Sequence, residues 1–299
     1  MAAPHGLDSM IDLSIIILSY NTKDLTFQCI QSVVSQYRKE LEENKIEIIA
    51  VDNNSTDGSQ PAIINIKNKM SNIKLIENKE NLGFGKGCNT GVKEAKGKYI
   101  LFLNSDTEVL DKGFLQMIGF LEKNPKVAIL GGKLHNVDGS TQPSAGKFYN
   151  LPYLIIMLLG LERLGFLRSS PNRIKKVDWV SGACMMVDRH IFEKLTGFDE
   201  QLFMYMEDME MCFRAQKLGY ATYFFPNLKL KHKSLGSSDR AFAIINIYKG
   251  ILHFYSKHKT RLEYLVAKTL LIAKAGILIL LGFLTFNSNL RDRYMKAIS

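Results

Sequence analysis

Three segments in the first third of the chain repeat one pattern, in which a short apolar run ends in Asn, Asp or Ser. They read LSIIILSYN (13–21), IEIIAVDNN (46–54) and YILFLNSD (99–106). Runs of this length and β-branched content are typical of strands buried on both faces of a parallel sheet. Leu25, Cys29 and Val33 lie at helical spacing between the first two runs, as expected of a crossover helix. The pattern therefore predicts an α/β fold.

The carboxyl ends of such strands meet at one edge of the sheet, where open α/β sheets bind ligands. Further strands are expected at 73–77, 127–134 and 179–189, a Gly-rich loop leads into a helix that ends near Lys96, and a short helix is expected at 191–195. The glycines of that loop alternate and do not form GxGxxG, which disfavours a dinucleotide site. Polar side chains should therefore gather at the edge for another kind of ligand.

Two segments, 151–167 and 262–286, are unusually apolar. The uninterrupted run from Ala275 to Phe286 would make a helix of about 18 Å, shorter than the roughly 30 Å of a bilayer's hydrocarbon core. We expect an amphipathic, monotopic helix at a membrane surface; the alternatives are a buried core helix or a dimer helix. Basic residues flank it, as binding to anionic headgroups requires. They are Lys257, Lys259, Arg261, Arg291, Arg293 and Lys296.

The net charge of +10 suits an anionic partner, which could be a nucleic acid, a membrane surface or a phosphorylated substrate. A nucleic-acid site would interleave basic and aromatic residues, whereas much of the positive charge here flanks apolar segments. The four cysteines form no CxxC pair, so neither a zinc site nor a disulfide scaffold is indicated. A reducing cytosol is the simpler compartment.

Carboxylates at two strand ends suggest a metal. Asp52 and Asp106 both follow apolar strands, and oxygen ligands of this kind suit Mg²⁺ or Mn²⁺ held between a protein and a diphosphate. A second group, Glu207, Asp208 and Glu210, lies in the apolar stretch YMEDMEMCFR (205–214). Uncompensated charge in such surroundings is costly, so these carboxylates are either catalytic or form a solvated face at a helix start.

Taken together, these segments resemble the family 2 glycosyltransferases with the GT-A fold, and most of all the rhamnosyltransferase-type members. The resemblance rests on seven motifs that occur in order between Leu13 and Ser238. They are SIIILSYN, IIAVDNNSTDGS, ENLGFGKGCNTG, YILFLNSDT, WVSGACMMVDR, GFDEQLFMYMEDMEMCFRAQKLGY and KHKSLGSS. It implies a Rossmann-like mixed sheet flanked by helices, with the apolar helical tail as an appendage.

The resemblance also implies a role for the residues at the polar edge. The nucleotide sugar would contact the ends of the first, second and fourth strands and the Gly-rich loop, and Asp52 would hydrogen-bond the base. The nucleotide-sugar residues are Ser19, Tyr20, Asn21, Asp52, Asn54, Asn81, Gly83, Phe84, Asn89, Asn104, Ser105 and Asp106. Asp106 matches the last carboxylate of the family's DxD metal motif, whose first position is here Asn104.

By the same resemblance, Asp208 is the general base, with Glu207 beside it at the acceptor. Trp179 and Gly182 would line the acceptor pocket, although a lone Trp is also typical of a core. His232 would complete the metal shell or touch the diphosphate, with Lys231, Lys233 and Ser237 as anion partners. A lone His among lysines is more often a surface residue than a ligand.

The implied enzyme is a metal-dependent, inverting hexosyltransferase of bacterial polysaccharide or O-antigen synthesis. Its donor would be deoxythymidine-diphosphate rhamnose or a uridine-diphosphate sugar, and its acceptor an undecaprenyl-diphosphate-linked saccharide at the cytoplasmic face of the inner membrane. A homodimer is a further candidate assembly, and no nucleic acid is expected. The alternatives are a membrane- or nucleic-acid-binding module without catalysis, and a nucleotidyltransferase.

We expect residues 11–240 to form the transferase domain, with 11–110 as its nucleotide-sugar half and 111–240 as its acceptor half. Residues 241–299 would form the helical, membrane-associating region.

Overall fold

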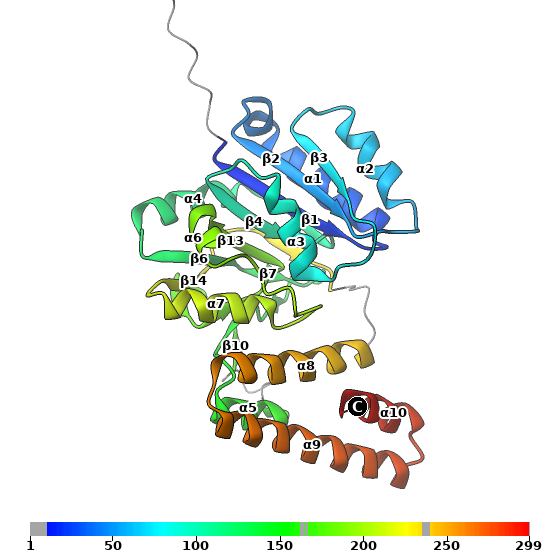
Figure 1. The fold of residues 1–299 in the computed structure, drawn as a ribbon. Coiled ribbons are helices and arrows are strands. Elements are labelled where there is room, and N and C mark those ends of the chain that lie inside the picture. Colours follow the sequence, from blue (N-terminus) through cyan, green and yellow to red (C-terminus); the bar gives the residue numbers. More distant parts are fainter. Residues whose placement is uncertain (1–10, 162–164, 166, 235–239, 299) are drawn as a thin grey trace, which may run out of the picture.

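A mixed eight-stranded sheet forms the centre of the molecule (Figure 1). The computed structural model describes residues 11–161, 165, 167–234 and 240–298. The strand order is β11-β14-β6-β13-β4-β1-β2-β3. In chain order these strands are β1 (Leu13–Ser19), β2 (Ile46–Asp52), β3 (Ile73–Glu77), β4 (Tyr99–Leu103), β6 (Val127–Gly132), β11 (Lys175–Val177), β13 (Cys184–Asp188) and β14 (Ala221–Phe225). The predicted α/β class is confirmed.

The parallel register of β1, β2 and β4 brings their carboxyl ends to one edge. Ser19 pairs with Asp52 across β1 and β2, and Ile16 pairs with Phe102 across β1 and β4. Every residue of β2 and β4 is buried, as expected of central parallel strands. The segments that follow these three strands therefore lie beside one another.

Helices cover both faces of the sheet, and the side chains of β1 alternate between the two cores. Ile15 and Ile17 face the core beneath α1, α2 and α4, whereas Ile16 faces the core beneath α3, α6 and α7. These helices are α1 (Lys23–Glu42), α2 (Ser59–Lys67), α3 (Phe84–Lys93), α4 (Gly113–Lys123), α6 (Arg189–Lys194) and α7 (Glu207–Lys217).

The expectation of one strand over 179–189 is wrong. The chain turns at 181–183, because the segments on either side belong to different sheets. Before the turn, β12 (Trp179–Val180) pairs with β9 (Ala145–Gly146), which also pairs with β10 (Arg168–Ser169). After the turn, β13 continues antiparallel to β4. The turn brings the backbone of 181–183 to the carboxyl edge of the main sheet.

A four-stranded sheet, of order β5-β15-β7-β8, lies next to this edge. The expected strand 127–134 is divided in the same way, since it ends as β6 and resumes as β7 after one residue. The four strands are β5 (Thr107–Val109), β7 (Leu134–His135), β8 (Thr141–Gln142) and β15 (Leu230–His232). This small sheet carries His232 to the end of β4.

The C-terminal helices form a layer on the α7 side of the sheet, together with α5 (Leu151–Leu158) (Figure 1). They are α8 (Arg240–His258), α9 (Arg261–Leu284) and α10 (Ser288–Ile298). One core runs from the main sheet through α7 into this layer, where Phe213 of α7 packs edge-to-face against Phe254 of α8. Residues 162–164 and 166 of the apolar segment 151–167 lie outside the described residues.

Helix α9 has an apolar face on each side. Ala267, Leu271 and Ala275 are buried against the layer, while Ile277, Leu280 and Leu284 are 67%, 60% and 70% exposed on the other side. Among the described residues α9 alone is long and apolar enough to cross a membrane, yet it packs along α5, α8 and α10. This exposed stripe argues against a fully buried core helix, and it fits either an interfacial helix or a dimer helix.

Glu210 ties α7 to α8 through a buried ion-pair network. Its carboxylate is fully buried and contacts Arg214 at 2.7 Å, Lys257 at 2.9 Å and His258 at 2.9 Å. Lys257 also reaches Asp199, 2.7 Å away. The hypothesis of a solvated acidic face is therefore wrong for Glu210. Burial alone would raise the pKa of Glu210, but hydrogen bonds from His258 and Arg214 outweigh it and lower the pKa to about 2.

We predict that Glu210→Gln lowers the free energy of unfolding by about 3–5 kcal/mol, because it removes the charge of a fully buried carboxylate from the partners that surround it. The contribution of Glu210 is complete above its unfolded pKa near 4.5 and is lost as the pH falls toward 2. Denaturant unfolding at pH 7 and pH 3 should show a smaller difference between variant and wild type at pH 3. Glu193→Gln, at an exposed pair with Arg189, is the control. Equal stability of the two variants would contradict the role of Glu210.

Candidate active site

Asp52, at the end of β2, is a buried carboxylate with one oxygen unused. Its Oδ2 accepts hydrogen bonds from the Ser55 backbone N–H at 2.9 Å and from Gln60 Nε2 at 2.8 Å. Its Oδ1 is buried and, among the described residues, has no partner. An unsatisfied buried oxygen is costly unless a ligand supplies a donor. The imino N–H of a pyrimidine base would satisfy it.

The ends of β1 and β2 are linked by their loops. Asn21, which adopts a left-handed backbone with φ of 53°, accepts the Thr56 N–H at 2.8 Å through Oδ1. Ser19 is buried and bonds Thr26 at 2.9 Å, so its hydroxyl supports the loop from inside. Tyr20 is half-buried, and Asn54 is exposed with φ of 66°. The loops therefore form a rim around Asp52.

The Gly-rich loop is shaped by an asparagine that follows Asp52 directly. Asn53 is buried and donates to Asn81 Oδ1 at 3.1 Å and to the Gly83 carbonyl at 3.0 Å. Gly83 has φ of 78°, and a Cβ there would lie 2.1 Å from the Phe203 carbonyl oxygen, so only glycine fits. The Phe84 N–H donates to the same carbonyl at 2.8 Å.

Asn89 lies on α3, one turn into the helix. Its amide exchanges two 2.9 Å hydrogen bonds with the Phe198 backbone and also reaches Glu200 at 3.2 Å. The Asn89 side chain therefore holds the 197–200 loop against α3. Its predicted contact with the nucleotide sugar stays a prediction.

Asn104, Asp106 and His232 meet where β4 and β15 end. His232 Nε2 lies 3.1 Å from Asp106 Oδ1 and 3.3 Å from Asn104 Nδ2. Ser105 Oγ bonds Thr22 at 3.2 Å, which ties this turn to the end of β1. Of the predicted anion partners, Ser237 lies outside the described residues.

Gln142, on β8, fixes which nitrogen of His232 faces Asp106. Gln142 Nε2 donates to Asn136 Oδ1 at 3.1 Å, so Oε1 is the atom that accepts from His232 Nδ1 at 2.7 Å. Nδ1 therefore carries a hydrogen, and Nε2 is the nitrogen that faces the Asp106 carboxylate. An imidazole nitrogen and a carboxylate oxygen 3.1 Å apart are both ligand types that divalent cations bind.

These donors fit a divalent cation that takes its other ligands from a substrate. No cluster of three or more His, Cys, Asp or Glu side chains able to hold a metal occurs in the part of the chain that the structure describes. Two protein ligands suit Mg²⁺ or Mn²⁺, which usually keep waters or bind phosphate oxygens as well. Asp106 and His232 are therefore candidate ligands that a diphosphate would complete.

Glu207 and Asp208 begin α7 after a strained turn. Tyr205 and Met206 have φ of 68° and 74°, a conformation that costs energy in non-glycine residues and is common at functional sites. Asp208 Oδ2 accepts the Gly182 N–H at 3.1 Å, so the turn at 181–183 holds the carboxylate. The same turn also contacts the end of β4, because the Asn104 N–H donates to the Ala183 carbonyl at 3.1 Å. The turn at 181–183 therefore connects the start of α7 to the end of β4.

The two carboxyls of this pair differ in their surroundings. Burial raises the pKa of both, and the charge of Asp208 raises the pKa of Glu207 further. The backbone N–H groups of Gly182 and Met209, and the charge of Arg168, favour the ionised form of Asp208. Glu207 Oε2 is buried without a partner among the described residues. Of the two carboxyls, Asp208 is therefore the one whose surroundings favour the ionised form.

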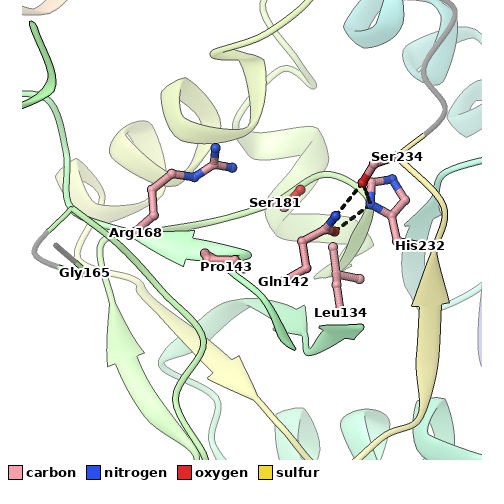
Figure 2. A pocket seen from close by; sticks show the side chains of 8 residues that line it. All are labelled: Leu134, Gln142, Pro143, Gly165, Arg168, Ser181, His232 and Ser234. Carbon is pink, nitrogen blue, oxygen red and sulfur yellow. Dashed lines mark hydrogen bonds between the residues drawn. The ribbon is translucent and has the colours of Figure 1, made fainter. Parts of the chain in front are cut away.

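A cavity of about 420 Å³ opens beside the turn at 181–183 (Figure 2). Gln142, Ser181, His232 and Ser234 line it, and Arg168 lies on the opposite side from His232. Trp179 is buried next to Arg168: its Nε1 donates to the Lys147 carbonyl at 2.9 Å, and the Arg168 guanidinium lies 5.4 Å from its ring centroid. The volume is that of a site for a small ligand.

Comparison with known proteins identifies the family. Residues 14–196 match the family described as Glycosyl transferase family 2. The chain belongs to this family. Family membership confirms the predicted glycosyltransferase and favours it over a binding module or a nucleotidyltransferase.

Two similar family members are named rhamnosyltransferases. The chain is 27% identical over 220 residues to N-acetylglucosaminyl-diphospho-decaprenol L-rhamnosyltransferase of Mycobacterium tuberculosis, covering 66% of this chain and 70% of that protein. It is 29% identical over 159 residues to rhamnosyltransferase WbbL of Escherichia coli K12, covering 50% of this chain and 60% of WbbL.

Solved structures confirm the GT-A fold of this family 2 glycosyltransferase. The mannosyltransferase PcManGT of Pyrobaculum calidifontis, solved with GDP-Man and Mn²⁺, aligns with a TM-score of 0.59 at 15% identity, covering 98% of this chain and 89% of that one. GalNAc-T7, solved with UDP, GalNAc and Mn²⁺, aligns with a TM-score of 0.61 at 16% identity, covering 83% of this chain and 50% of the GalNAc-T7 chain. The chain thus spans half of the GalNAc-T7 chain.

Sequence reasoning missed three residues of this glycosyltransferase's site. Asn53 had a usable signal, since it directly follows Asp52 at a strand end. Gln142 and Arg168 lie on two-residue strands without periodicity, and only pairing with distant strands brings them to the cavity.

Proposed function

We propose that this glycosyltransferase moves a sugar, with inversion at the anomeric carbon, from a nucleoside-diphosphate sugar to a lipid-linked saccharide. The observation that carries the proposal is the arrangement around one cavity. His232 lines the cavity and lies 3.1 Å from Asp106, the other candidate metal ligand. Ser181 also lines it, and the next residue, Gly182, donates its N–H to Asp208, the proposed base. Asp52 has a buried oxygen without a partner among the described residues, at the same sheet edge.

The chemistry is a single displacement. The acceptor hydroxyl gives its proton to Asp208 as its oxygen forms a bond to the anomeric carbon. The bond from that carbon to the diphosphate oxygen breaks on the opposite face, and the nucleoside diphosphate leaves with the electron pair. Attack from the opposite face inverts the configuration, and no covalent sugar–enzyme intermediate forms.

Asp208 is suited to this step by its surroundings. Burial strengthens its attraction for a proton, while the N–H groups of Gly182 and Met209 orient the carboxylate. Glu207, with its proton, removes one of two adjacent negative charges. The pair therefore presents one base near neutral pH.

Asp106 and His232 would hold a Mg²⁺ or Mn²⁺ ion, which when bound neutralises the charge that develops on the diphosphate. Gln142 keeps His232 in the orientation that this requires. The Mn²⁺ named with PcManGT and GalNAc-T7 supports a divalent ion in this fold.

The substrates follow from the relatives. Two relatives are named rhamnosyltransferases, and one of these names includes a decaprenyl-diphosphate-linked sugar. We infer rhamnose carried by deoxythymidine diphosphate as the first donor, with uridine-diphosphate hexoses next. The acceptor is a polyprenyl-diphosphate-linked saccharide, and the enzyme acts as a monotopic protein on the cytoplasmic face of a bacterial inner membrane.

We predict that Asp208→Asn lowers kcat for transfer by about a hundredfold or more, because the amide cannot take the proton, while donor affinity is unchanged. Glu207→Gln mimics the protonated partner and should keep kcat within about tenfold of the wild type. Transfer is measured by nucleoside diphosphate release with acceptor, and donor affinity by calorimetry.

Asp138→Asn, at an exposed turn, is the matched control and should behave as the wild type. Full turnover by Asp208→Asn would reject its role as the base. Loss of turnover in Glu207→Gln alone would assign the base to Glu207.

We also predict that Ile277→Asp, Leu280→Asp and Leu284→Asp together release the protein from anionic vesicles, since these side chains form the outward stripe of α9. Leu218→Asp, 48% exposed at the end of α7, should bind vesicles as the wild type does. Binding is measured by vesicle flotation and folding by thermal unfolding. A folded triple variant that still floats would contradict membrane binding by this face.

A further inference from the structure

Arg168 supplies a positive charge to the cavity from the wall opposite His232 (Figure 2). Its side chain is exposed, and no carboxylate of the described residues lies within ion-pair distance of its guanidinium. The guanidinium instead lies over the Trp179 ring, which is buried and fixed by its hydrogen bond to Lys147. An aromatic platform of this kind orients a guanidinium without neutralising it.

The position of Arg168 relates the cavity to the base. Ser181 lines the same cavity, and the next residue, Gly182, donates its N–H to Asp208. Arg168 is near enough to Asp208 for its charge to lower the pKa of that carboxyl against the effect of burial. A sugar hydroxyl at Asp208 would therefore have the guanidinium of Arg168 on one side.

The chain around Arg168 also leads to the apolar layer. β10, which begins at Arg168, pairs with β9, and the segment between these strands contains α5. α5 packs against α9, and Ile155 and Leu159 near its end are 42% and 67% exposed. Exposed apolar side chains thus lie on α5, in the segment between β9 and β10, and β10 begins at Arg168.

We propose that Arg168 binds the phosphate that joins the acceptor saccharide to its lipid, so that the sugar reaches Asp208 and the lipid leaves along α5 and α9. The inference rests on the proposed function and names the acceptor subsite within it. A guanidinium matches a phosphate through two parallel N–H donors, and the apolar face beyond it matches a prenyl chain.

The same geometry separates this phosphate from that of the donor. The donor diphosphate belongs with the candidate metal ligands, because His232 lies across the cavity from Arg168 (Figure 2) and Asp106 lies 3.1 Å from His232. Arg168 is therefore free to select an acceptor that carries its own anionic group. A neutral glycolipid would lack this contact.

The test uses farnesyl diphosphate as the probe and farnesol as its neutral counterpart, both in detergent solution. Binding to the full chain is measured by calorimetry and by the fluorescence of Trp179, the chain's one tryptophan. We expect saturable binding of farnesyl diphosphate, with farnesol about tenfold weaker. Prior saturation with Mn²⁺ and a nucleoside diphosphate should leave this binding unchanged.

Arg168→Ala should weaken farnesyl diphosphate binding by about tenfold. Arg168→Lys should weaken it less, because Lys keeps the positive charge but lacks the two parallel N–H donors of Arg. Arg173→Ala removes a charge from an exposed position that does not line the cavity and should match the wild type. Thermal unfolding checks that each variant is folded.

Three results would overturn the proposal: no binding of farnesyl diphosphate by the wild type, unchanged affinity in Arg168→Ala, or displacement of the probe by the nucleoside diphosphate. The last would place Arg168 in the donor site. Nucleotide-sugar binding by Arg168→Ala is measured separately. If neither the wild type nor Arg168→Ala binds the nucleotide sugar, the proposed function is contradicted. If both bind it and Arg168→Ala keeps its affinity for farnesyl diphosphate, only the acceptor subsite is contradicted.

Discussion

The parallel register of β1, β2 and β4 is the constraint on which the site depends. It sets Ser19 beside Asp52 and carries the turn after β4 to the same edge. Thr22 and Ser105 then join the two loops by a 3.2 Å hydrogen bond. Buried parallel strands cannot slip by one residue without turning their apolar side chains the wrong way. The hydrophobic pattern of three strands thus determines where Asp52 and Asp106 lie.

The second constraint is the cost of burying three carboxylates at the start of α7. Glu210 is compensated by Arg214, Lys257 and His258, and so becomes a link between the transferase core and the apolar helical layer. Glu207 and Asp208 form no ion pair among the described residues, and burial raises the pKa of both. One short segment therefore both anchors the layer and supplies the base. This arrangement couples the chemistry to the part of the molecule that would meet a lipid.

Sequence reasoning recovered what periodicity and strand-end polarity encode. The α/β class and the polar edge follow from runs such as 13–21 and 46–54, whereas the family rests on the resemblance of seven motifs. It failed where chain position alone does not specify spatial neighbours. The break at 181–183 arises because β12 and β13 pair with strands of different sheets. Gln142 reaches His232 only because β8 and β15 both pair with β7. The burial of Glu210 depends likewise on cations from α8, some 47 residues away.

The central claim is that one nucleotide sugar binds across Asp52 and Asp106. The most direct measurement is calorimetric titration of the wild type, Asp52→Asn and Asp106→Ala with a panel of nucleotide sugars in the presence and absence of Mn²⁺. The account predicts that one sugar nucleotide binds the wild type, that both variants weaken the same ligand, and that only Asp106→Ala removes the effect of Mn²⁺. A folded wild type that binds no member of the panel, or variants that leave its affinity unchanged, would contradict it.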